Sequence, residues 1–319
     1  MVISFQDGEK MKYKDWLNEW LENYVKSTSK RKTYIRYEGI LRNHIIPHLG
    51  EFEIDDISVI LLQKFVTQLL QGGNVRTGRG LSANSVNSII TVLQVSLETA
   101  NNVGLSKNYV ADKIKRPKIA ETRITCFTCA EQKKIEQAVL SDNREKTFGI
   151  LLSLYTGLRV GELLALEWSD IDLLKGEISV NKTCYDGIGP GGKYCRITDK
   201  PKTDSSVRTI PFPRQLKPYL RAMYRKNKRG NVIRGENGVP SVRSYQKTFS
   251  SLLSSLKIPH KGFHALRHTF ATRALECGMD VKTLSEILGH KNSAVTLNRY
   301  VHSMMEHKRE MMNKLGKRL

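Results

Sequence analysis

The first third of the chain repeats apolar side chains every three or four positions, which is the period of an amphipathic α-helix. Such runs cover residues 16–24, 34–46, 61–70 and 86–97. Pro47 is expected to end the second run, and Ser82 or Asn84 to cap the fourth. The pattern predicts a bundle of four or five helices between Tyr13 and Ala111, without a strand.

The pattern changes to mixed α/β after a basic, polar segment. Thr128 is a plausible N-cap for one helix, a second is expected to end at Gly157, and a third to start near Val160. Three short strands are predicted at residues 176–183, 193–198 and 207–213, and helices then continue to the C-terminus. We expect a mostly α protein: a helical domain (1–116), a linker (117–125), an α/β domain with a small antiparallel sheet (126–303) and a tail helix (304–319).

Composition adds to this outline mainly through charge, which indicates a class of partner. The chain has 319 residues, of which 39% are hydrophobic, enough for two globular domains. Its formal net charge is +21, and the basic residues are spread along the chain, as in a protein that wraps a polyanion. A merely well-solvated surface is the alternative. The chain has no run of about 18 apolar residues and no apolar signal core at its N-terminus, so we expect a cytoplasmic protein.

Five cysteines, an odd number, are typical of a reducing compartment rather than a disulfide framework. Cys126 and Cys129 form a C-x-x-C pair, and zinc would need two further ligands at suitable spacing. Cys184 and Cys195 are eleven residues apart in a Gly-rich hairpin and do not supply that spacing. We therefore expect neither a metal nor another cofactor.

Basic clusters mark the predicted connections of the helical domain. Flexible cations and free backbone N–H groups at loops and helix starts contact phosphates well, although any one cluster could be a solvated loop. The candidate DNA-binding residues are Lys30, Arg31, Lys32, Arg76, Arg79, Lys113, Lys115, Arg116 and Lys118.

Two arginines of the α/β domain stand in unusual places. Arg159 is flanked by apolar residues in YTGLRVGELLAL, where a cation needs an anionic partner; an ion pair with Glu162 is the alternative to a ligand. Arg267 follows His264 by three residues, so both side chains share a helix face and can reach one phosphate. Alone, this H-x-x-R spacing arises often by chance.

Three further polar residues are candidates for chemistry, and each also has a common structural explanation. Lys202 lies on a turn between strands, where most lysines face solvent. His290 follows Gly289 at a helix end, where a structural role is the usual one. Tyr300 is one of twelve tyrosines, most of which are expected in the core.

The order Arg, Lys, His-x-x-Arg, Gly-His, Tyr is much more specific than its parts. The segments TGLRVGELLALEWSDID, KTDSSVRTIP, HALRHTFATRALECGMDVKTLSEILGH and SAVTLNRYVH resemble those of the tyrosine recombinase family, also called phage integrases. With the helical domain as the family's core-binding domain, the resemblance spans nearly the whole chain. It implies the tyrosine recombinase fold and a metal- and ATP-independent enzyme.

The resemblance also implies a role for each matched residue. Arg159 and Arg267 would clamp the scissile phosphate, and Tyr300 would attack it to form a 3′-phosphotyrosyl bond. His264 would be the general acid/base and Lys202 would protonate the leaving 5′-oxygen. His290 would hydrogen-bond the phosphate. The catalytic set predicted from the resemblance is Arg159, Lys202, His264, Arg267, His290 and Tyr300.

Partners also follow from the resemblance. The family acts as a homo-tetramer on two double-stranded DNA core sites, with accessory DNA-bending and excision factors as further candidates and no membrane. Met304, Met305, Met311, Met312 and Leu315 fall on one side of the tail helix, which could dock on the next protomer or on its own domain. Many integrases also carry an N-terminal arm-binding domain, and none is visible before Tyr13.

Integration or excision of a phage or transposon is the favoured function, since the Gly-rich insert YDGIGPGGKY resembles that of element-borne integrases. A bacterial cytoplasm, at the nucleoid, is the expected location. Two other readings remain open. A type IB topoisomerase uses nearly the same residues, and a non-catalytic DNA-binding regulator would share the charge and the helical bundle.

Overall fold

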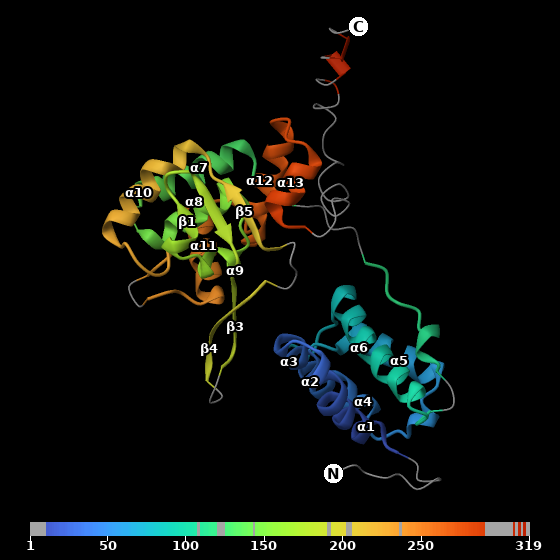
Figure 1. Ribbon diagram of the computed structural model, residues 1–319. Helices are drawn as coiled ribbons and strands as arrows, with labels where there is room; N and C mark the ends of the chain where they lie inside the picture. Colours follow the sequence, from blue (N-terminus) through green and yellow to red (C-terminus); the bar gives the residue numbers. More distant parts are fainter. Residues whose placement is uncertain are drawn as a thin grey trace. The chain divides into compact units, whose positions relative to one another are not determined.

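The chain folds into two units, each with its own hydrophobic core: an N-terminal unit, Met1–Thr122, and a C-terminal unit, Arg123–Leu319 (Figure 1). The computed structural model describes residues 11–106, 109–119, 125–142, 144–189, 193–201, 206–235 and 238–290, together with positions 309, 312, 313, 315 and 316.

The N-terminal unit is helical in its described part, as predicted. Two of its helical runs contain a π-helical turn, η1 (Leu21–Val25) between α1 and α2, and η2 (Leu41–Ile45) between α3 and α4. Its elements are α1 (Tyr13–Trp20), α2 (Lys26–Thr28), α3 (Arg31–Ile40), α4 (Ile46–Leu49), η3 (Ile54–Asp56), α5 (Val59–Gly72), α6 (Ala83–Asn102) and η4 (Ala111–Lys113).

Aromatic side chains of α1 form the centre of this bundle, and their polar atoms are satisfied by α6. The Tyr13 hydroxyl and Ser96 Oγ lie 2.6 Å apart, and Trp16 Nε1 donates to the Ser96 carbonyl at 3.0 Å. Trp20 Nε1 donates to Thr99 Oγ1 at 3.2 Å. These contacts fix α1 against α6, because a buried polar atom without a partner costs about 1–3 kcal/mol.

Two helix boundaries in this unit test the sequence pattern directly. Ser82 is the N-cap of α6 and accepts a hydrogen bond from the backbone of Ser85, as one of the two predicted caps. The predicted stop at Pro47 is wrong, because the helical run continues to Leu49. The π-helical turn η2 shifts the hydrogen-bond ladder just before Pro47, and a residue without an N–H is tolerated there.

The C-terminal unit is mixed α/β. Thr128 caps α7 in a capping box with Glu131, and Gly157 ends α8 in the left-handed conformation at φ 68°, both as predicted. The elements are α7 (Cys129–Ser141), α8 (Glu145–Thr156), α9 (Val160–Ala165), η5 (Trp168–Asp170), β1 (Ile171–Asp172), β2 (Glu177–Val180), β3 (Thr183–Ile188), β4 (Tyr194–Asp199), β5 (Arg208–Pro211), η8 (Arg214–Leu216), α10 (Lys217–Lys226), α11 (Val242–Ser255), α12 (His264–Glu276) and α13 (Val281–Leu288).

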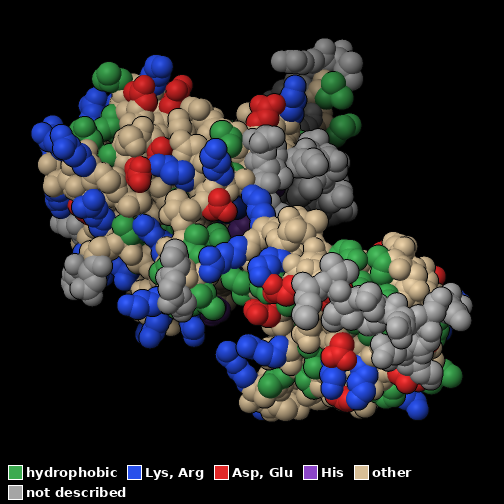
Figure 2. Space-filling view, turned by 60° about the horizontal axis from the view of Figure 1, so that its bottom comes forward, with side chains coloured by type: hydrophobic (Ala, Val, Ile, Leu, Met, Phe, Trp, Pro, Cys, Tyr) green, Lys and Arg blue, Asp and Glu red, His purple; other side chains and the backbone are tan. Residues whose placement is uncertain are grey.

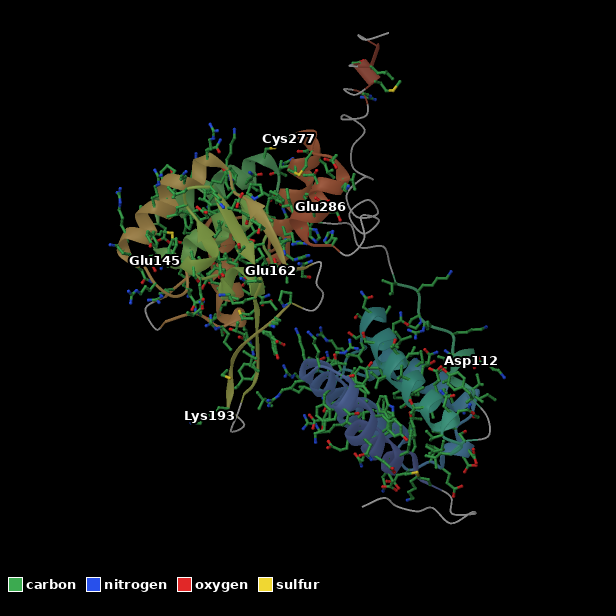
Figure 3. All side chains as sticks on the ribbon, viewed as in Figure 1. Asp112, Glu145, Glu162, Lys193, Cys277 and Glu286 are labelled. Atoms are coloured by element: carbon green, nitrogen blue, oxygen red, sulfur yellow. The ribbon has the colours of Figure 1, made fainter. Side chains whose placement is uncertain are left out.

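The strands form two antiparallel sheets rather than the single small sheet expected. One sheet has the order β1-β2-β5, with Ile178 opposite Ile210, and the other is the β3–β4 hairpin, with Tyr185 opposite Ile197. The predicted strand at 176–183 was too long, because β2 ends at Val180 and β3 is a separate strand. The hairpin extends from the body of this unit, with Lys193 near its far end (Figures 1 and 3).

Helix α12 has buried side chains along most of its length and packs against α8. The segment before α7 is tied to it, since Thr269 Oγ1 accepts from the Phe127 backbone N–H at 2.9 Å and Arg273 donates to the Phe127 carbonyl at 3.1 Å. These two hydrogen bonds fix the start of α7 against the later turns of α12. In the part of the chain that the structure describes, no helix is long and apolar enough to cross a bilayer.

Candidate active site

Arg267 is one of the largest fully buried side chains, with 1% of its surface exposed. Its guanidinium lies between the C-terminal ends of two helices. Nη1 donates to the Gly157 carbonyl at the end of α8 (2.9 Å), and Nη2 donates to the Leu288 carbonyl at the end of α13 (2.6 Å). Helix C-termini carry partial negative charge, so these carbonyls stabilise a cation that burial would otherwise destabilise.

The last turn of α13 presents its carbonyl groups in an ordered way. Gly289 takes the left-handed conformation at φ 63°, and the N–H groups of Gly289 and His290 donate to the Glu286 and Ser285 carbonyls. This is a Schellman motif, which satisfies two of the carbonyls that a helix end leaves unpaired. The carbonyls of Ile287, Leu288 and Gly289 each accept instead from an arginine: Arg208, Arg267 and Arg159, respectively.

Arg159 is held at the N-cap of α9 and remains about a third exposed. Its Nη1 donates to Glu162 Oε1 at 2.6 Å, its backbone N–H donates to Oε2 at 3.0 Å, and its Nη2 donates to the Gly289 carbonyl at 3.4 Å. The ion pair with Glu162 that the sequence left as an alternative is therefore present. It leaves the guanidinium partly accessible from solvent.

Glu162 is buried inside the C-terminal unit at α9 (Figure 3). Burial raises the pKa of Glu162, but the hydrogen bonds and charge of Arg208 and the charge of Arg159 outweigh this effect. They hold that pKa below its ordinary value. The carboxylate is therefore ionised at neutral pH, between two cations.

Arg208 was not among the residues that the sequence singled out. It is the first residue of β5; Nη1 and Nη2 donate to Glu162 Oε1 and Oε2 at 3.2 and 3.0 Å, and Nε donates to the Ile287 carbonyl at 2.5 Å. The strand period carries a signal for this placement. Arg208 and the fully buried Ile210 are two residues apart, so they share the inward face of the strand.

His290 and His264 lie near Arg267 in different ways. His290 Nε2 is 2.9 Å from Arg267 Nη2, so the predicted Gly-His pair and the buried arginine are in contact. His264 is the exposed first residue of α12, three residues before Arg267, and its ring packs edge-to-face on His268 at 4.5 Å between centroids. Arg159, Arg267 and His290 thus converge on the end of α13, with His264 one helical turn from Arg267.

Two members of the predicted catalytic set, Lys202 and Tyr300, lie outside the described residues. Each is close in sequence to a described element of this unit. Lys202 falls between the end of β4 at Asp199 and the start of β5 at Arg208, and Tyr300 follows His290 by ten residues. Of the tail stripe, Met312 and Leu315 are described and exposed, whereas Met304, Met305 and Met311 lie outside the described part.

The candidate DNA-binding cations of the N-terminal unit are all exposed. Lys30 and Arg31 begin α3, and Asn74 Oδ1 turns the Gly-rich loop by accepting from the backbone of Arg76. Arg116 differs from the others, since its guanidinium donates to Thr91 and Gln94 on α6. Lys and Arg side chains are spread over both units on the face shown in Figure 2.

The C-x-x-C pair lies at the start of α7. Cys126 Sγ is 3.2 Å from Thr272 Oγ1, and Cys129 is exposed at the first position of the helix. Cys184 is buried in β3 and Cys195 is exposed in β4. Within the described ranges, no three His, Cys, Asp or Glu side chains group as metal ligands would.

Family models match both units of the chain. The model of the phage integrase family matches residues 126–307, more than half of the chain, and the model of the phage integrase N-terminal SAM-like domain matches residues 12–70. The chain belongs to the phage integrase family. It is a tyrosine recombinase, an enzyme of the class that cleaves and rejoins DNA.

Curated relatives agree with this assignment over most of the chain. A tyrosine recombinase XerC-like protein of Caldanaerobacter subterraneus subsp. tengcongensis is 33% identical, covering 98% of this chain and 84% of the relative. The ICEBs1 integrase of Bacillus subtilis is 28% identical, covering 90% of this chain and 78% of the relative.

Solved structures share the fold of this integrase. The Tn1549 transposon integrase in complex with a circular intermediate DNA matches with a TM-score of 0.79 at 22% identity, over 96% of this chain and 99% of that one. A lambda integrase tetramer bound to a Holliday junction matches with a TM-score of 0.66 at 22% identity, over 89% of this chain and 78% of that one. The predicted tyrosine recombinase fold, with its helical N-terminal domain, is thus confirmed.

Proposed function

We propose that this tyrosine recombinase integrates and excises a mobile DNA element at specific sites, through a phosphotyrosyl intermediate on Tyr300. One observation carries the assignment to this chain. Arg159 and Arg267, from two different elements, both donate to carbonyls at the end of α13, beside His290. Integrases of a transposon and of a phage are among the proteins that share its fold, which supports a mobile element as substrate.

The two arginines would bind the non-bridging oxygens of the scissile phosphate. A guanidinium offers planar, paired N–H donors that suit phosphate, and its charge stabilises the extra negative charge of the transition state. The carbonyls of Gly157, Leu288 and Gly289 hold both guanidinium groups in place before DNA arrives. The enzyme would therefore need little rearrangement of these donors during the reaction.

The remaining residues of the predicted set would move protons. The Tyr300 phenol oxygen attacks phosphorus while the bond to the 5′-oxygen breaks, so the phosphate passes to the enzyme. His264 would take the phenolic proton, and Lys202 would give a proton to the leaving 5′-oxygen. His290 would donate a hydrogen bond to the phosphate. Attack by a 5′-hydroxyl on the phosphotyrosyl bond reverses these steps and rejoins DNA, without ATP.

The DNA is proposed to run along the exposed cations of the N-terminal unit as well as this site. Lys30 and Arg31 at the start of α3, and Arg76 and Arg79 in the loop after α5, are placed in loops and helix starts where phosphate contacts are common. We propose that a homo-tetramer assembles on two core sites in the bacterial cytoplasm, with accessory DNA-bending or excision factors. The lambda integrase tetramer on a Holliday junction supports this assembly by likeness of fold.

The segment after His307 is proposed to join neighbouring protomers in that tetramer. Deleting it should leave cleavage partly intact and weaken assembly on DNA in analytical ultracentrifugation. Equal assembly by the truncated and full-length proteins would contradict this role.

The test uses a nicked suicide duplex. Its sequence is the junction that forms when the two ends of the mobile element that carries this gene are joined. Wild type and Tyr300→Phe are incubated with it in EDTA and run on a denaturing gel. We expect a slow-migrating protein–DNA band for wild type that Tyr300→Phe lacks. A band that persists in Tyr300→Phe would overturn the assignment of the nucleophile, and a DNA-binding regulator would form no band with either protein.

Product topology then separates a recombinase from a topoisomerase. With two core sites on a supercoiled plasmid, a recombinase yields deleted or inverted products. Relaxation of the plasmid with unchanged sequence order would instead indicate a topoisomerase.

A further inference from the structure

Arg208 is nearly as buried as Glu162, whereas Arg159, which binds the same carboxylate, is partly exposed. The side chains of Arg208 and Glu162 are 7% and 4% exposed, against 35% for Arg159. Arg208 binds both oxygens of the carboxylate and, through Nε, the Ile287 carbonyl. Two cations thus share one buried anion.

This sharing decides how much positive charge the site presents. A carboxylate pairs readily with one guanidinium through two parallel hydrogen bonds, which would neutralise Arg159 and turn its paired donors inward. Here Arg208 occupies both carboxylate oxygens. The Arg159 side chain reaches Glu162 through Nη1, and its Nη2 reaches the Gly289 carbonyl. The three charges sum to +1, and Arg159 is the member of the three that solvent can reach.

The same side chain fixes the end of α13. Arg208 Nε and Arg267 Nη2 donate to the neighbouring carbonyls of Ile287 and Leu288. A shift of Arg208 would therefore disturb both the partner of Arg159 and the end of α13, which Arg267 binds and His290 follows.

We propose that Arg208 is a positioning residue, which balances the charge of Glu162 and holds its carboxylate so that Arg159 keeps its charge and its orientation for the scissile phosphate. This inference rests on the proposed phosphate-binding role of Arg159. Lysine at position 208 would keep the charge but could not bind both carboxylate oxygens and a carbonyl with fixed geometry. Methionine would remove the charge as well.

The experiment compares single-turnover adduct formation on two suicide duplexes, one with an ordinary scissile phosphate and one with a methylphosphonate, which lacks the negative charge. The ratio that matters is the rate on the phosphate divided by the rate on the methylphosphonate. It does not depend on the fraction of folded, active enzyme. Arg159→Ala should lower this ratio, because its charge matters most on the charged phosphate. We expect Arg208→Lys to slow cleavage of the phosphate about tenfold to a hundredfold and to lower the ratio. Arg208→Met should lower the ratio further.

Arg196→Lys is the matched control, since Arg196 is a half-buried arginine of β4 that donates to the Leu164 carbonyl at 3.1 Å. Its ratio should equal that of wild type. Equal losses on both substrates in the Arg208 variants would overturn the inference and leave the proposed role of Arg159 intact. A wild-type ratio in Arg159→Ala would overturn that role, and the inference with it.

Discussion

Arg267 Nη2 and His290 Nε2 lie 2.9 Å apart, which joins the buried arginine of α12 to the residue that follows α13. A guanidinium has donors and no acceptor, so Nε2 of His290 must accept this hydrogen bond. The tautomer that fits this contact carries its proton on Nδ1. In the proposed reaction, Nδ1 is the nitrogen of His290 that would donate to the phosphate.

Replacing His290 tests this arrangement. We expect His290→Phe to slow single-turnover cleavage about 10²-fold, the usual cost of losing one donor to a developing anion. DNA affinity should change little, since many other cations contact the backbone. His290→Asn, whose amide can donate and accept, should retain more activity than His290→Phe. Equal rates for His290→Phe and wild type in a quenched-flow assay would show that the contact is structural.

Substitutions at Gly289 and Gly278 can separate the effect of backbone strain from an effect on the geometry of the site. Its φ is 63°, and a Cβ added there would lie 3.0 Å from Arg208 Nη1. Gly278 also has a positive φ, 90°, but a Cβ there would meet no atom within 4 Å. Alanine at either position should lower the free energy of unfolding by about 1–2 kcal/mol, the cost of a left-handed residue with a Cβ.

Cleavage should distinguish the two variants. Gly289→Ala pushes on Arg208 and should slow adduct formation, whereas Gly278→Ala should cleave at the wild-type rate once both are assayed well below their melting temperatures. Equal rates in the two variants would mean that the site tolerates movement of Arg208.

The sequence predicted those parts of this enzyme that depend on local patterns. Helix caps at Ser82 and Thr128 and the glycine end at Gly157 could be read because each follows from the chemistry of one or two residues. Pro47 could not, since the π-helical turn before it depends on packing. The predicted strand at 176–183 merged β2 with the start of β3, because the break between them depends on pairing: β2 pairs with β5, and β3 with β4.

The site was predictable as a set of residue types in order, but its connections were not. The family pattern pointed to Arg159, Arg267 and His290, although it did not reveal that three arginines divide the carbonyls of one helix end. Arg208 and Glu162 are 46 positions apart, so their ion pair depends on how β5 meets α9. Long-range pairs of this kind leave only a weak trace in a single sequence.

The buried carboxylate predicts how stability depends on pH. Arg208 and Arg159 hold the pKa of Glu162 below its ordinary value of 4.5, so the folded state binds this proton less readily than the unfolded state. The stabilisation is therefore complete above that value and is lost as the pH falls through the lowered pKa. Glu162→Gln should cost about 3 kcal/mol at neutral pH, because it leaves two cations without their anion.

The difference in melting temperature between wild type and Glu162→Gln should shrink as the pH falls below 4.5. Glu276→Gln is the control, since Glu276 also pairs with an arginine three residues away but is 44% exposed. Its effect should be within about 1 kcal/mol at every pH. A pH-independent gap for Glu162→Gln would contradict the lowered pKa.

Substitutions of Arg79 and Arg116 can show which cations of the N-terminal unit contact DNA. Both are exposed, but the Arg116 guanidinium is bound to Thr91 and Gln94 of α6, whereas Arg79 lies in the Gly-rich loop after α5. A cation that neutralises a phosphate releases a counterion, so its loss lowers the slope of log affinity against log salt by about 0.9. We expect that change for Arg79→Ala and a wild-type slope for Arg79→Lys, measured by fluorescence anisotropy over a salt series.

Arg116→Ala should change the slope less and lower the stability of the unit by about 1 kcal/mol, because it removes hydrogen bonds to α6. The reverse order of slopes would mean that Arg116 leaves α6 to bind the DNA backbone, and that the loop after α5 faces away from it.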